Sequence, residues 1–146
     1  MMTFTLGEEG LEPLCGYLDS RTKGHTRVFF LLNGDLGSGK TTLVRNFVRF
    51  RGGRDDVTSP TFSLSQDYDD VFHYDFYQKE YNHLLELGFI ELFEREGIHF
   101  IEWADAGIKD LLQKCGFAIV RVDIVLLDSG EREYIISDEY ITSTQS

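Results

Sequence analysis

Apolar residues in the first third of the chain alternate between helical and strand-like spacing. Apolar positions between Leu11 and Leu18 recur with a helical period, and acidic residues precede them, as a helix N-terminus favours. The dense apolar run RVFFLLNG, residues 27–34, is typical of a strand covered on both faces. Residues 43–48 then return to the helical period. The pattern predicts a helix, a buried strand and a second helix, in this order.

The middle of the chain opens with residues that break regular structure. Ser59-Pro60 interrupts the pattern, and VFHYDFY, residues 71–77, alternates like a half-buried strand, so we expect a loop followed by two strands. A helical stripe runs from Tyr81 to Leu92, and core packing explains it completely. IHFIEWAD, residues 98–105, indicates a buried strand that ends in acids, and AGIKDLLQK after it indicates a short helix.

The last part of the chain predicts a C-terminal β-hairpin. Alternate apolar residues from Val120 to Leu126 share one face, residues 128–130 form a turn, and EREYIIS returns as the second strand. The polar residues 138–146 are expected to fray. Together the elements predict α/β architecture with some antiparallel strands.

Composition agrees with one folded domain. The chain has 146 residues, of which 42% are hydrophobic and 14% aromatic, with only 2 Pro, so it can bury a real core. We find no linker or internal repeat and expect a single domain over residues 1–146. Cys15 and Cys115 match no zinc or Cys-x-x-Cys pattern, and both are expected to be reduced, buried thiols.

Charge limits the partners that the chain can meet directly. The formal net charge is −11 and the pI about 4.7, so the average field repels free nucleic acid and acidic membranes. A nucleotide pocket is compatible with this charge, because a few cationic or N–H groups can override it locally. The N-terminus MMTFTLGEEG lacks a leader pattern, and no stretch approaches the roughly 18 apolar residues of a membrane span. We expect a cytoplasmic protein that binds no membrane.

A phosphate-binding motif joins the first buried strand to the second helix. Gly34-x-x-x-x-Gly39-Lys40-Thr41 matches the P-loop pattern and has the strand and helix context that the pattern requires. Gly34, Gly37 and Gly39 allow backbone conformations that point N–H groups inward, and a Cβ there would block close approach of phosphate oxygens. The fold class is therefore a P-loop NTPase-type α/β domain with a central mixed parallel and antiparallel sheet flanked by helices.

Two side chains of the motif have expected roles in holding a nucleotide. Lys40 should reach the β- and γ-phosphates, and the Thr41 hydroxyl should ligate a Mg²⁺ ion that bridges them. In P-loop proteins an acid at the end of a neighbouring buried strand also anchors the metal, and Glu102 lies at such a position. A solvated acid at a strand end is the alternative interpretation of Glu102.

Other residues near the ends of these strands have less defined roles. Asp75 either orients water or metal near the γ-phosphate or is an exposed hairpin residue. His73 shares a strand face with Asp75, but no third close ligand completes a metal site, so we interpret it as structural. Trp103 is either a core residue or an aromatic that faces a partner.

Absent motifs narrow the class of P-loop protein. No Asn-Lys-x-Asp stretch follows the P-loop, which argues against a regulatory GTPase and favours adenine. A small-molecule or nucleoside kinase remains an alternative, although this length and the lack of an Arg-rich lid segment make it less natural. A nucleotide-dependent interaction module without useful catalysis is a third possibility.

Four motifs together resemble one family. GDLGSGKTTLVR, SPTFSL, HYDFY and IEW, in this order and in a chain of this size, closely resemble the bacterial TsaE (YjeE) family. Its members are the small ATPases of the tRNA threonylcarbamoyladenosine (t6A) pathway, which modifies the adenosine beside the anticodon. The resemblance covers most of the chain, and its specificity comes from the four motifs in combination.

The resemblance implies roles for particular residues. Thr41 and Glu102 would hold Mg²⁺, and Asp75 would stand near the γ-phosphate, so Lys40, Asp75 and Glu102 are the candidate catalytic residues. Residues 59–62, Ser-Pro-Thr-Phe, would form a switch that senses this phosphate. The resemblance also implies that the N-terminal segment, Thr5 to Glu9, helps to enclose the nucleotide. It implies a set of residues that bind ATP or ADP: Gly34, Asp35, Leu36, Gly37, Ser38, Gly39, Lys40, Thr41, Thr42, Thr5, Glu9 and Arg132.

Three positions depart from the family pattern. The Gly that usually precedes the C-terminal arginine is Glu131 here, Gln78 replaces a common Arg, and Ala104 replaces a common Pro. The Glu131 departure bears on the assignment of Arg132 to the nucleotide. Neither Gln78 nor Ala104 removes a phosphate or metal ligand, but Gln78 lacks any contact that the arginine would make.

The resemblance also implies a macromolecular partner. Family members do not transfer the threonylcarbamoyl group themselves; they bind the TsaB–TsaD heterodimer and use ATP hydrolysis to support repeated turnover. The net charge of −11 agrees with tRNA being met only indirectly, through this complex.

Overall fold

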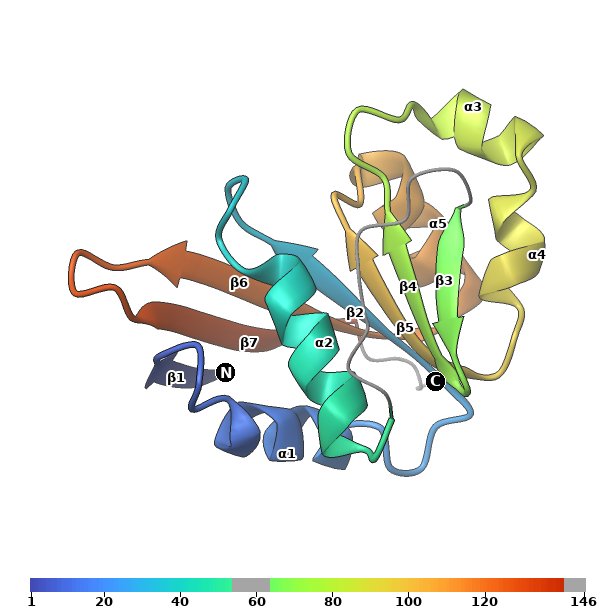
Figure 1. The fold of residues 1–146 in the computed structure, drawn as a ribbon. Helices are drawn as coiled ribbons and strands as arrows, with labels where there is room; N and C mark the ends of the chain where they lie inside the picture. Colours follow the sequence, from blue (N-terminus) through green and yellow to red (C-terminus); the bar gives the residue numbers. More distant parts are fainter. Residues whose placement is uncertain (54–63, 141–146) are drawn as a thin grey trace.

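Seven strands form one sheet in the part of the chain that the computed structural model describes, residues 1–53 and 64–140 (Figure 1). Their order across the sheet is β1-β7-β6-β2-β5-β4-β3. The strands are β1 (Met2–Leu6), β2 (Arg27–Asn33), β3 (Ser65–Tyr68), β4 (Val71–Asp75), β5 (Gly97–Glu102), β6 (Ala118–Leu126) and β7 (Arg132–Tyr140).

The sheet is parallel in the middle and antiparallel at both sides. β2 pairs in parallel with β5 and β6, and β4 pairs in parallel with β5. Antiparallel pairs join β3 to β4, β6 to β7 and β7 to β1. This confirms the predicted mixed sheet and places the predicted C-terminal hairpin, β6–β7, inside it.

Helices cover both faces of the sheet, and the two cores divide along β2 (Figure 1). Val28, Phe30 and Leu32 pack with residues of α1 (Glu12–Ser20) and α2 (Lys40–Phe50). The alternate residues Phe29 and Leu31 pack in a second cluster, with residues of α3 (Tyr81–Glu86), α4 (Phe89–Phe93) and α5 (Ala106–Cys115). Because β2 is buried on both faces, it anchors the start of the loop that follows it.

Several local expectations need correction. The stripe from Tyr81 to Leu92 is two short helices, because Gly88 takes a left-handed φ of 85° between them. β4 is buried on both faces rather than one, since it lies between two other strands of a sheet with helices on both sides. At the hairpin, Leu126 is 56% exposed, so it lies beyond the buried part of the face that Val120, Val122 and Ile124 share.

The ends of other elements also differ from the prediction. β7 extends through Tyr140, so Asp138 and Tyr140 pair with β6 instead of fraying, and the rest of that predicted tail lies outside the described residues. Residues 59–62, the predicted switch, also lie outside them. Cys15 is buried as expected, and burial raises the pKa of its thiol to about 12, whereas Cys115 is exposed.

Over the ranges 1–53 and 64–140, we find no helix with the length and apolar character that crossing a membrane demands.

Candidate functional site

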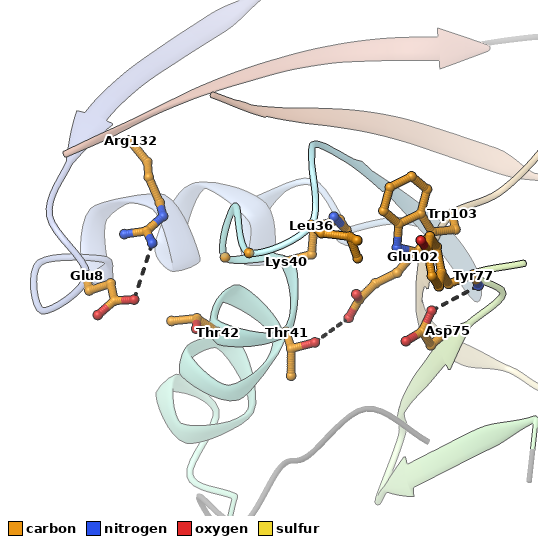
Figure 2. A pocket seen from close by; sticks show the side chains of 12 residues that line it. Glu8, Leu36, Lys40, Thr41, Thr42, Asp75, Tyr77, Glu102, Trp103 and Arg132 are labelled. Atoms are coloured by element: carbon orange, nitrogen blue, oxygen red, sulfur yellow. Dashed lines mark hydrogen bonds and ion pairs between the residues drawn. The ribbon is translucent and has the colours of Figure 1, made fainter. Parts of the chain in front are cut away.

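The carboxyl ends of β2, β4 and β5 meet beside the N-terminus of α2 and form a pocket of about 300 Å³ (Figure 2). In open α/β sheets, ligands bind at this edge, where neighbouring connections leave the sheet in opposite directions. The described residues that line the pocket are Glu8, Leu36, Gly37, Gly39, Lys40, Thr41, Thr42, Asp75, Tyr77, Glu102, Trp103 and Arg132.

The loop between β2 and α2 leaves the start of α2 open to an anion. Gly37 and Gly39 have left-handed φ values of 78° and 109°, which favour glycine. Among the described residues, no side chain caps the first turn of α2, so its N–H groups and positive dipole end suit a phosphate. At Gly34 the reason for glycine is different, because a Cβ would lie 2.5 Å from Ser38 Oγ and 2.9 Å from the Ile124 carbonyl oxygen.

Lys40 is held in this loop with 5% of its surface exposed. Its Nζ donates hydrogen bonds to the carbonyl oxygens of Gly34 at 2.7 Å and Asp35 at 3.0 Å. Burial lowers the pKa of the Lys40 ammonium, and the negative charges of Glu102, Asp75 and Asp35 oppose this effect. The cation is therefore close to the open helix end, where it can meet a phosphate oxygen.

Glu102 is buried between two hydrogen-bonding partners. Its Oε2 accepts a hydrogen bond from Thr41 Oγ1 at 2.8 Å, and the same oxygen lies 2.6 Å from Nε2 of His73. A carboxylate only accepts, so His73 donates from Nε2. Glu102 is 3% exposed, which contradicts the interpretation of a solvated strand-end acid.

Asp75 lies level with Glu102 in the parallel pairing of β4 and β5. Its Oδ1 accepts a hydrogen bond from the backbone N–H of Tyr77 at 3.0 Å, which fixes the turn after β4. Both carboxylates line the pocket, from adjacent strand ends (Figure 2). Asp75 ends β4, which forms an antiparallel hairpin with β3, and it is half-buried rather than exposed.

Arg132, at the start of β7, closes the opposite side of the pocket. Its Nε donates to the Ser38 carbonyl oxygen at 2.6 Å, and its guanidinium lies 3.5 Å from the carboxylate of Glu8. Of the N-terminal segment, Glu8 lines the pocket, whereas Thr5 and Glu9 are not among the residues that line it. Thr5 is in β1, paired with Glu133, and Glu9 lines a separate cavity near α1.

The loop residues expected to bind nucleotide divide between two cavities. Leu36, Gly37, Gly39 and Thr42 line the pocket, but Gly34, Asp35 and Ser38 line a cavity on the far side of the loop, toward β6. Leu36 lines both.

Sequence reasoning missed part of the site. His73, interpreted from the sequence as structural, is fully buried and does not line the pocket, but its bond to Glu102 links it to the site, and its Nδ1 has no hydrogen-bond partner among the described residues. Its spacing of two residues from Asp75 on one strand was the available signal. Tyr77, the last residue of HYDFY, was given no role from the sequence, and the turn after β4 brings it to the pocket.

The donor set fits magnesium with few protein ligands. Over the described ranges, no group of three or more His, Cys, Asp or Glu side chains is placed to hold a metal ion. Mg²⁺ usually binds one or two carboxylates and completes its shell with phosphate and water. The hydroxyl of Thr41 and the carboxylate of Glu102 are the oxygen ligands available beside the open helix end.

Comparison with known proteins identifies the family. The family model described as "Threonylcarbamoyl adenosine biosynthesis protein TsaE" matches residues 8–134. The chain belongs to the TsaE family. A TsaE protein of Rickettsia typhi is 38% identical over 115 residues, which cover 75% of this chain and 76% of that protein. A TsaE protein of Bacillus subtilis is 35% identical over 106 residues, 70% of this chain and 63% of that protein.

Both TsaE relatives carry the name "tRNA threonylcarbamoyladenosine biosynthesis protein", which places the family in this tRNA modification. The fold is also that of a solved structure, YdiB of Bacillus subtilis, with a TM-score of 0.65 and 22% identity. The superposition covers 94% of this chain and 84% of that one. It confirms the predicted α/β architecture.

Proposed function

We propose that the chain is a Mg²⁺-dependent subunit that binds and hydrolyses ATP in support of tRNA t6A modification. The observation that carries this proposal is the convergence of Lys40, Thr41, Glu102 and Asp75 around the uncapped N-terminus of α2. These are a cation, a hydroxyl and two carboxylates beside a ready anion site, as phosphoryl chemistry needs.

Each residue would have a distinct task. The N–H groups of Gly37, Gly39 and the first turn of α2 bind phosphate oxygens, and Lys40 turns from its carbonyl partners toward the β- and γ-phosphates. Thr41 and Glu102 would hold Mg²⁺, which neutralises charge on the phosphates when bound. Asp75 orients water at the terminal phosphate. Arg132 lies beside the loop, where it can contact the nucleotide.

The partner would be the TsaB–TsaD complex, in the cytoplasm. A protein with net charge −11 meets tRNA more readily through a partner than directly. Hydrolysis in the pocket would then change how the chain binds that complex and support repeated turnover.

Nucleotide binding is tested with Lys40→Ala. Calorimetry with magnesium should show ATP and ADP binding to the natural chain, and affinity for ATP about 10- to 150-fold weaker for the variant, since a charged hydrogen bond contributes about 1.5–3 kcal/mol. Lys23→Ala is the matched control, because Lys23 is exposed and its substitution removes the same charge. Equal ATP affinity of both variants would contradict the role of Lys40.

The partner is tested by capture of the TsaB–TsaD heterodimer with ATP, with ADP and without nucleotide. Retention should differ among the three states, and Lys40→Ala should abolish the difference. Equal retention of the heterodimer in all three nucleotide states would refute the switching role. Transfer of labelled γ-phosphate to a small acceptor would instead indicate a kinase.

A further inference from the structure

Trp103 has an uncommon backbone conformation at the edge of the pocket. Its φ is 65°, in the left-handed region that bulky residues rarely adopt, directly after Glu102 at the end of β5. Such an outlier in a site is a reason to look for a functional constraint. This conformation accompanies a partly buried indole that lines the pocket and also packs against the second core cluster (Figure 2).

The indole lies over the ammonium of Lys40. Nζ is 4.4 Å from the centroid of the Trp103 ring, within the range of a cation–π contact. The same ammonium donates to the carbonyl oxygens of Gly34 and Asp35. An ammonium has three N–H donors, so two carbonyls and one aromatic face account for its surroundings.

A second aromatic ring supports the indole. The rings of Tyr77 and Trp103 have centroids 4.9 Å apart, and Tyr77 is fixed by its backbone bond to Asp75. Lys40, Trp103, Tyr77 and Asp75 therefore form a continuous series of contacts across the pocket.

We propose that Trp103 is a positioning residue for Lys40, whose indole holds the ammonium in the nucleotide-free pocket and is displaced from it by the β- and γ-phosphates. This rests on the proposed function, because it requires a nucleoside triphosphate in the pocket. A cation–π contact is weaker than a charged hydrogen bond, so the indole is the partner that gives way.

Intrinsic fluorescence tests the displacement, because Trp103 is the single tryptophan of the chain. The full chain is titrated with MgATP while calorimetry measures binding under the same conditions. We expect a saturable change in emission with the calorimetric affinity. Nucleotide-free Lys40→Met should show emission shifted in the same direction, because it lacks the cation. Heat of binding with unchanged emission would overturn this inference and leave the proposed function standing, whereas no heat would overturn both.

Nuclear magnetic resonance supplies a measurement that depends on no variant of Trp103. Ring current should move the ε-methylene signals of Lys40 upfield in the free chain, and MgATP should return them to the ordinary lysine position. The signals are assigned by their absence in Lys40→Arg. Signals at the ordinary position before nucleotide is added would overturn the proposal.

Affinity separates a displaced indole from one that contacts nucleotide. Trp103→Leu removes a competitor for the ammonium, so it should bind MgATP about 2- to 5-fold tighter, with Trp103→Phe in between. Weaker binding by both variants would mean that the indole contacts the nucleotide, which overturns the proposal.

Discussion

Glu102 shows that the site buries a charged residue at a cost in free energy. Its carboxylate is removed from water, which costs free energy unless hydrogen bonds replace the hydration. Thr41 and His73 supply these bonds at one oxygen, Oε2. A buried carboxylate beside a P-loop hydroxyl is better explained by cation binding than by a role in core packing.

Glu102→Gln tests this interpretation. The amide keeps the size and an oxygen that can accept from Thr41, but it loses the charge that attracts Mg²⁺. We expect MgATP binding about 10-fold weaker or more, from the loss of a charged interaction of about 1.5 kcal/mol or more, with metal-free ATP affinity unchanged or improved. Calorimetry with magnesium and with EDTA measures both. Glu91→Gln, on the exposed side of α4, is the control and should bind MgATP as the natural chain does.

At the scale of elements, α2 and α5 begin in opposite ways. α5 is capped by Asp105, whose side chain accepts from the N–H of Ile108 at 2.9 Å, and it ends at Gly116 in a left-handed conformation. α2 has no side-chain cap at its start. One helix satisfies its ends within the chain, and the other leaves its N-terminus available to a ligand.

Two glycines test which helix positions require glycine. Gly16 lies inside α1, and a Cβ there would meet its nearest atom, Phe50 Cζ, at an ordinary 3.7 Å, so Gly16→Ala should stabilise the fold by about 0.5–1 kcal/mol. Gly116 has a φ of 76°, so Gly116→Ala should destabilise it by about 1 kcal/mol. Urea unfolding measures both. Shifts of the same sign would show that backbone conformation does not decide these positions.

The whole molecule is a sheet between two cores, and the second core encloses polar groups. His99 is fully buried and stacked on Phe29, with ring centroids 4.3 Å apart. Its Nε2 lies 2.9 Å from the Arg95 carbonyl oxygen and its Nδ1 2.8 Å from the Tyr74 hydroxyl. A neutral imidazole satisfies both bonds, donating from Nε2 and accepting at Nδ1.

Stability should fall with acid because of His99. Burial lowers the pKa of its imidazole from 6.5 to about 4; nearby Arg95 and Arg27 add to this, while the Arg95 carbonyl and Asp67 oppose it. As pH falls from 6.5 toward 4, the His99 imidazole becomes protonated in the unfolded chain but stays neutral in the folded chain. The loss in the free energy of unfolding is on the order of 2–4 kcal/mol when the pH reaches about 4. Urea unfolding between pH 6.5 and 4 gives the free energy of unfolding at each pH. This free energy should fall more steeply with decreasing pH for the natural chain than for His99→Gln, and equal slopes would contradict the effect.

Local chemistry and most secondary-structure elements could be predicted from the order of residues alone. Gly39, Lys40 and Thr41 define the phosphate loop through their spacing, and the apolar run before them defines the buried strand, because both signals arise between neighbours in the chain. The helical periodicity predicted one helix where there are two, because Gly88 takes a left-handed conformation while the apolar pattern continues past it.

Only the tertiary structure decided which distant residues share the pocket. The pairing of β4 with β5 brings Asp75 level with Glu102, and His73 reaches Glu102 across the same pair. The positions of Glu8 and Arg132 depend on how β1 and β7 pair at the other side of the sheet. Strand order and register are set by packing of the whole chain, so spacing within one segment does not encode them.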